Sequence, residues 1–155
     1  MKINLIFTLL LAFTATSCIK DLICIDGNGI VETQPRETSD FTQLENSTIA
    51  DVVYKKADSP GITITAESNL LGHFVTETVN GNLKIRTDPS NACFDYVERP
   101  VITVTSPVLN KVVLSGSGEI IADILSGNSV LIKLSGSGDF FTEVISCSDL
   151  SLILS

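Results

Sequence analysis

A repeat of 20 residues constrains the fold of this 155-residue chain more than any other feature of its sequence. The segment at residues 112–118 (VVLSGSG) returns at 132–138 (IKLSGSG), and residues 152–155 (LILS) begin a third copy. A fixed period near 20 residues is typical of proteins whose repeats stack on one another. We therefore expect a solenoid rather than a globule with one closed core.

Setting the copies in register separates inward from outward positions. Four columns stay apolar in every copy and are predicted to face the core: Val112/Ile132/Leu152, Leu114/Leu134/Leu154, Ile120/Phe140 and Ile124/Val144. Two mixed columns are predicted to face solvent: Lys111/Leu131/Ser151 and Val113/Lys133/Ile153. Stacked repeats would place like residues about 4.8 Å apart, the spacing of neighbouring strands.

The Ser-Gly-Ser-Gly segments are predicted to form the corners of the repeat. Glycine suits a place where the backbone turns sharply and neighbouring coils approach closely, and the serines could bond backbone groups or the next coil's serine. A phosphate loop is the alternative, but the segments lack the Lys-Ser/Thr of nucleotide loops and the third glycine of the dinucleotide motif. The corner interpretation is therefore favoured.

The rest of the chain is predicted to be all-β. Alternating apolar and polar residues indicate strands at 62–67, 74–79, 83–87 and 100–105, and two short strands fit residues 41–54. Glycine-rich residues 26–29 indicate a turn, whereas residues 30–37 are polar and 88–99 form a long loop. No stretch has the pattern of an amphipathic helix.

The N-terminus has the order of a secretory signal. Residues 1–17 give a short positive region, an apolar run too short for a membrane span and the small residues Ala15-Thr-Ser17 before Cys18. The Ala-Thr-Ser-Cys segment resembles a bacterial lipobox, which implies cleavage before Cys18 and a lipid on its thiol. Residues 18–25 would then be a tether to one domain at 26–155, and the lipid would bind a membrane.

The net charge limits the partners of this protein, and its cysteines bear on its cellular compartment. A net charge of −8 excludes nucleic acid as a partner. Three cysteines besides Cys18 allow three disulfide pairings, and an exported compartment permits disulfides. We favour Cys24–Cys93, because it would tie the N-terminal edge to the long loop, with Cys147 as a partly buried filler.

The signal, residues 27–29 (GNG), 62–65 (ITIT), 83–86 (LKIR) and the repeated LSGSG together resemble the family described as putative auto-transporter adhesin, head GIN domain. The resemblance covers about residues 24–155. It implies a right-handed, single-stranded β-helix with irregular N-terminal strands, exported by bacteria with two membranes, and it carries over no catalytic residues. Family members usually continue through more repeats, and the third copy stops at Ser155 within a corner. We therefore expect a chain truncated at its C-terminus.

Candidates for chemistry are few. The acidic pairs Glu119/Asp139 and Asp123/Glu143 are weak Ca²⁺ candidates, and solvated surface acids are the favoured alternative. The single histidine, His73, has no cysteine or acidic partner at metal-ligand spacing. A catalytic site of Ser68, His73 and Asp88 is formally possible, but no nucleophile-elbow motif or similar sequence surrounds the serine. No cofactor, metal or catalytic residue is predicted.

The long loop offers the best contact candidates. Phe94, Tyr96 and Arg99 could form a binding surface, or the loop could be pinned by Cys93 with its aromatic rings tucked against the end of the stack. We expect a lipoprotein of the outer membrane, periplasm or cell surface that is a non-catalytic binding or adhesion module for a surface glycan or protein. The alternatives are a polysaccharide-acting β-helix enzyme and an envelope scaffold without a small ligand.

Overall fold

The computed structural model describes residues 24–90 and 92–155. The predicted signal at 1–17 and the predicted lipid site at Cys18 lie outside these residues. The described chain is all-β apart from one 3-10 turn, η1 (Leu71–His73), and none of its helical structure is long and apolar enough to cross a membrane. The strands are β1 (Ile25–Asp26), β2 (Val31–Arg36), β3 (Gln43–Asn46), β4 (Asp51–Lys56), β5 (Gly61–Glu67), β6 (Phe74–Val79), β7 (Asn82–Thr87), β8 (Phe94–Asp95), β9 (Val101–Ser106), β10 (Lys111–Leu114), β11 (Ile120–Ser126), β12 (Ser129–Leu134), β13 (Phe140–Ser146) and β14 (Asp149–Leu154).

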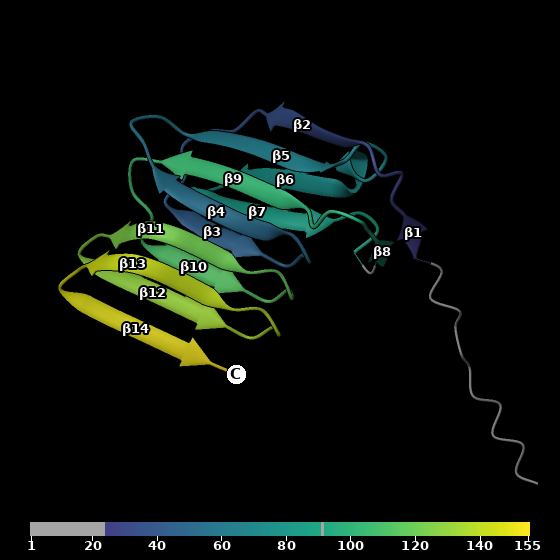
Figure 1. The fold of residues 1–155 in the computed structure, drawn as a ribbon. Coiled ribbons are helices and arrows are strands. Elements are labelled where there is room, and N and C mark those ends of the chain that lie inside the picture. The colour runs from purple at the N-terminus through teal and green to yellow at the C-terminus, as the bar shows by residue number, and fades with distance from the viewer. Residues whose placement is uncertain (1–23, 91) are drawn as a thin grey trace, which may run out of the picture.

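Two six-stranded sheets lie face to face with the core between them (Figure 1). Sheet 1 has the order β6-β7-β3-β10-β12-β14, and sheet 2 has the order β2-β5-β9-β4-β11-β13. Most neighbours are parallel, although β6 and β7, β2 and β5, and β5 and β9 pair antiparallel. A small parallel pair of β1 and β8 lies beside them.

The 20-residue period is the pairing register of the C-terminal strands. Val112 pairs with Ile132 and Ile132 with Leu152 in sheet 1, while Ile120 pairs with Phe140 in sheet 2. We call one strand of sheet 1, its corner and the following strand of sheet 2 a rung. Each rung from residue 111 onward therefore stacks on the one before it, as the repeat predicted.

The order of rungs in space differs from their order in the chain. The rung of β3 and β4 lies between the pair β7 and β9 and the rung of β10 and β11. Leu44, for example, pairs with Leu83 on one side and Val112 on the other. The repeat could not show this insertion, because the corner of the β3–β4 rung, residues 47–50 (STIA), contains no Ser-Gly-Ser-Gly.

Two segments with no predicted strand also pair. β2 lies at the edge of sheet 2, where Pro35 is tolerated because its missing N–H is not needed for a second ladder. The long loop contains β8, whose Phe94 pairs with Ile25 of β1. Both strands depend on partners distant in sequence, which local alternation does not reveal.

Burial of the inward columns falls along the stack. Val112 is fully buried, Ile132 is 4% exposed and Leu152 is 58% exposed. Leu114 and Leu154 show the same contrast within their column. Among the described residues no strand covers β14 on its far side, so the third copy's inward side chains lie against solvent.

The prediction that Ile124 and Val144 face the core is wrong. Leu125 is fully buried in their place, whereas Ile124 is half-buried and Val144 exposed. Pairing of β11 with β4 ends at Ala122, and the carboxylate of Asp123 accepts hydrogen bonds from the backbone nitrogens of Lys56 and Ile124. This irregularity shifts the alternation by one residue, which exchanges the two faces of the strand.

Candidate functional site

The Ser-Gly-Ser-Gly corners are held by main-chain hydrogen bonds to the rung beside them. The nitrogens of Ser115 and Gly116 both donate to the Asn46 carbonyl, at 2.9 and 3.2 Å, and those of Ser117 and Gly118 both donate to Thr48, at 3.1 Å. The next corner repeats the pattern on the carbonyls of Leu114 and Gly116. A corner whose N–H groups are all used in this way has none left to hold a phosphate.

The corner glycines are required by close approach, as predicted. A Cβ at Gly116 would clash with the Thr48 carbonyl oxygen, and one at Gly136 would clash with that of Gly116. The hydrogen bonds predicted for the corner serine side chains are not found. In the part of the chain that the structure describes, no protein hydrogen bond is made by the side chains of Ser115, Ser117, Ser135 and Ser137. The corner bonds are main-chain bonds.

The weak Ca²⁺ candidates do not form a metal centre. Asp123 uses both carboxylate oxygens on backbone nitrogens, and Glu143 and Asp139 are exposed. The main-chain nitrogen of Glu119 donates to Asp51 at 2.9 Å. Within residues 24–90 and 92–155 no three acidic, histidine or cysteine side chains gather to hold a metal ion.

The formal Ser68, His73 and Asp88 combination is not assembled for catalysis. The Ser68 hydroxyl accepts a hydrogen bond from Asn28, while His73 Nδ1 lies 2.9 Å from the main-chain oxygen of Asp88 and not from its carboxylate. The imidazole also packs on Phe94, with ring centroids 5.6 Å apart. These contacts hold the loop.

The loop candidates have mixed positions. Cys93 forms a disulfide with Cys24, the pairing favoured from the sequence, and Cys147 is free and half-buried. Phe94 is only 8% exposed and packs on Phe74, so it cannot serve as a contact residue. Tyr96 packs partly on the core. Arg99 is exposed and donates to Asp51 at 3.0 Å, and this carboxylate raises the pKa of the guanidinium.

A buried carboxylate, that of Glu67, joins the N-terminal turn to the long loop before β9. Glu67 ends β5 with no exposed surface, and it accepts hydrogen bonds from the main-chain nitrogens of Gly29, Val97 and Glu98. The Gly29 bond foremost, and those from Val97 and Glu98, lower the pKa of Glu67, against the opposing effect of burial. The absence of a side chain at Gly27 provides the space for the Glu67 carboxylate, because a Cβ there would clash with it.

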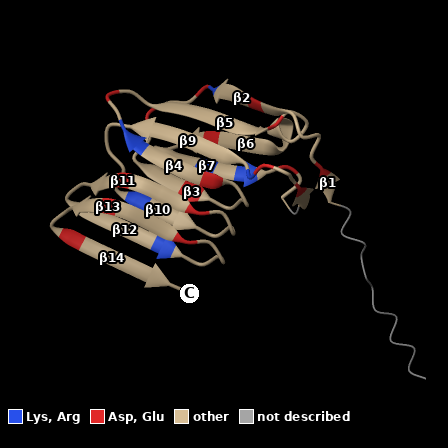
Figure 2. Ribbon diagram, in the orientation of Figure 1, with Lys and Arg blue, Asp and Glu red and all other residues tan. Residues whose placement is uncertain are grey.

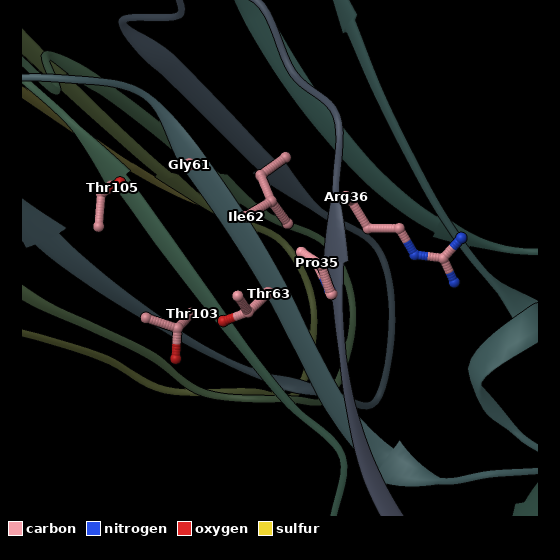
Figure 3. Close-up of a pocket in the computed structure, with 7 residues that line it drawn as sticks. All are labelled: Pro35, Arg36, Gly61, Ile62, Thr63, Thr103 and Thr105. Atoms are coloured by element: carbon pink, nitrogen blue, oxygen red, sulfur yellow. The ribbon is translucent and has the colours of Figure 1, made fainter.

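A shallow hollow of about 310 Å³ lies on the outer face of sheet 2. Figure 3 shows its lining, which comes from β2, β5 and β9: Pro35, Arg36, Gly61, Ile62, Thr63, Thr103 and Thr105. Thr63 and Thr103 pair directly across the two strands, and Thr105 donates to the Ser59 carbonyl at 3.1 Å. The Arg36 guanidinium points away from the threonines and donates to the Leu71 carbonyl at 2.9 Å.

Neither Glu67 nor the hollow was predicted from the sequence. The only signal for the hollow is the spacing Thr63-x-Thr65 and Thr103-x-Thr105, which indicates strands with threonines on one face. Glu67 continues an alternating strand and carries no local sign of burial. Figure 2 shows charged residues in the loops and on many of the strands, whereas β9 carries none.

Stacked rungs, corners closed by main-chain bonds and wide outer faces define a repeat-built all-β protein. The chain belongs to the family described as "Putative auto-transporter adhesin, head GIN domain", which matches residues 40–155. Together with the disulfide, this membership indicates an exported protein. No functionally curated protein matches the chain.

Solved structures share the fold. A "putative adhesin" from Bacteroides fragilis superposes with a TM-score of 0.76 at 19% identity, covering 83% of this chain and 60% of that one. A "putative lipid binding protein" from Parabacteroides distasonis gives 0.65 at 26% identity, covering 84% and 65%. A "putative adhesin" from Parabacteroides merdae gives 0.64 at 21%, covering 79% and 60%. The chain thus spans about three fifths of the length of these proteins.

Proposed function

We propose that this protein is a lipid-anchored, non-catalytic binding module of the bacterial cell envelope, built as a right-handed, single-stranded β-helix. The family is described as that of a putative adhesin head domain, which supports a binding role, and rungs in 20-residue register suit a β-helix. One observation carries the proposal: the polar groups considered as possible catalytic or ligand sites are used in hydrogen bonds within the protein, whereas the outer face of sheet 2 is free to bind. Asp123, Glu67 and the corner N–H groups all serve the fold, whereas the outer face of sheet 2 is broad and hollowed.

The anchor would hold one end of the domain near the membrane. Six residue steps separate Cys18 from Cys24, which the disulfide fixes to the long loop. An extended chain of that length reaches about 20 Å. A lipid on Cys18 would therefore keep the β1–β8 end close to the bilayer and leave the outer faces of both sheets accessible.

The anchor is tested in a bacterium with two membranes that produces the full chain. Feeding a clickable fatty acid should label the protein and place it in the membrane fraction, and Cys18→Ala should abolish both. Protease added to intact cells distinguishes a surface-facing protein, which is cleaved, from a periplasmic one. Retention of the label in Cys18→Ala would contradict lipidation at this residue.

The binding role is tested with the purified mature protein on arrays of glycans and matrix proteins. Binding without product formation supports a non-catalytic module. Release of oligosaccharides from a bound polysaccharide would show an enzyme, and absence of any binding would favour an envelope scaffold.

A further inference from the structure

The outer face of sheet 2 carries one continuous row of side chains across all six strands. The pairing register joins Pro35 to Thr63, Thr63 to Thr103, Thr103 to Val53, Val53 to Ile121 and Ile121 to Phe141. We call these six residues the outer row. Five strand spacings of about 4.8 Å give it a length near 24 Å, which suits an extended ligand of several units.

The hollow at the β2 end of the outer row contains two hydroxyl groups that are available to a ligand. In the described part of the chain, the hydroxyls of Thr63 and Thr103 have no protein partner, whereas Thr65 bonds Thr33 and Thr105 bonds Ser59. A threonine hydroxyl both donates and accepts, so this pair can meet a ligand hydroxyl in either sense. Gly61 keeps the space beside them open, because a Cβ there would lie 2.9 Å from Thr105 Oγ1.

The far part of the outer row is apolar and exposed. Ile121 is 43% exposed and Phe141 is 52% exposed, and the Pro35 ring flanks the hollow at the other end. Sugar rings present hydroxyl groups at their rims and apolar C–H faces, which such side chains can cover. Aromatic rings and few polar groups are the usual composition of small-ligand sites.

The charges favour an uncharged ligand. No residue of the outer row is ionisable, and Arg36, the one cation lining the hollow, is turned away toward Leu71. The nearby Arg99 and Asp51 neutralise each other, and Lys55, which pairs with Thr105, is an exposed cation at the end of β4, followed there by Lys56. With a net charge of −8, the chain repels acidic polymers at long range.

From these contacts we infer that the outer row of sheet 2 is a binding track for a neutral polysaccharide, with the Thr63–Thr103 hollow as its polar end and Phe141 as its stacking end. This inference rests on the proposed binding function and names the face and the ligand class. The protein would distinguish one neutral polysaccharide from another by hydrogen bonds between sugar hydroxyls and the hydroxyls of Thr63 and Thr103, because a polar group that is covered without a partner is costly.

The test is affinity electrophoresis of the mature chain in gels containing dextran, xylan, mannan or laminarin, with alginate as the acidic counterpart. We expect retardation by at least one neutral polymer and none by alginate. Thr63→Val with Thr103→Val removes both hydroxyls at nearly constant shape, and Phe141→Ser removes the exposed ring. Each should weaken binding at least tenfold.

Matched controls lie on the opposite sheet. Ser151→Ala removes an outward hydroxyl from sheet 1, and Ile153→Ser removes an outward apolar side chain that is 43% exposed. Both should leave retardation unchanged, and circular dichroism melting should show that every variant folds. If a threonine variant fails to fold, Phe141→Ser alone decides the matter.

The inference is overturned if no neutral polymer retards the protein, if alginate is preferred, or if the outer-row variants bind fully. Array binding to a protein, or binding that only sheet 1 variants reduce, would overturn it while leaving the proposed binding function intact. Depolymerisation of a bound polysaccharide would instead remove the proposed non-catalytic function.

Discussion

The carboxylate of Glu67 accepts a hydrogen bond from the main-chain nitrogen of Val97 at 2.7 Å, which joins the end of β5 to the loop before β9. The same carboxylate holds Gly29 of the N-terminal turn. Two segments without extensive strand pairing are thus fixed by one side chain. A buried carboxylate needs such partners, because a buried charge without hydrogen bonds is costly.

Glu67→Gln should lower the melting temperature at pH 7, because an amide N–H₂ would face a backbone donor. The pKa of Glu67 is lowered in the folded protein, so its stabilising effect is present above the unfolded value of about 4.3 and is lost as pH falls through the folded pKa. The wild type should therefore lose more stability than Glu67→Gln between pH 5 and acid. Glu98→Gln, on an exposed side chain, is the control. Equal pH dependence of the wild type and Glu67→Gln would contradict this role.

Gly116→Ala should destabilise the protein by about 1–3 kcal/mol, because the added Cβ would clash with the Thr48 carbonyl and push two rungs apart. Gly72→Ala is the matched control, since nothing lies within 4 Å of its Cβ position, and it should change stability by no more than about 0.5 kcal/mol. Urea unfolding followed by circular dichroism measures both. Equal effects would show that the corner can open.

Leu114→Ala should cost about 2–5 kcal/mol of unfolding free energy, the usual cost of truncating a buried leucine. Leu154→Ala changes the same column of the repeat, but Leu154 is 67% exposed, so its cost should stay below about 1 kcal/mol. The comparison is made by denaturant titration. A similar large loss in both would mean that another layer covers β14 in solution.

Asn46→Leu should destabilise the protein by about 2 kcal/mol or more, although leucine stands at the paired position 114. The buried Asn46 side chain donates to the Ala50 carbonyl and accepts from the nitrogen and hydroxyl of Thr48. Leucine would leave these groups without partners in a dry corner. Asn128→Leu, at an exposed asparagine, is the control. A stabilised Asn46→Leu variant would show that the asparagine is replaceable by packing.

Reduction of the Cys24–Cys93 disulfide should lower stability by about 2–5 kcal/mol, because it removes from the unfolded chain a cross-link between residues 69 positions apart. The measurement is denaturant unfolding with and without a thiol reductant, compared with Cys24→Ser. Cys147→Ser should retain the sensitivity to reductant, since Cys147 forms no disulfide. Loss of that sensitivity in Cys147→Ser would indicate a different pairing.

The sequence by itself determined the stacked part of the protein. A 20-residue register fixes which residues of β10, β12 and β14 pair, because identical rungs stack like on like, and the glycines of the corner mark the close approach. Only the tertiary structure decided the rest. The insertion of β3 and β4, the burial of Leu125 in place of Ile124, the anchoring by Glu67 and the meeting of Thr63 with Thr103 all join residues far apart in the chain. Such contacts depend on long-range packing and on single irregularities such as Asp123, which leave no periodic trace in the sequence.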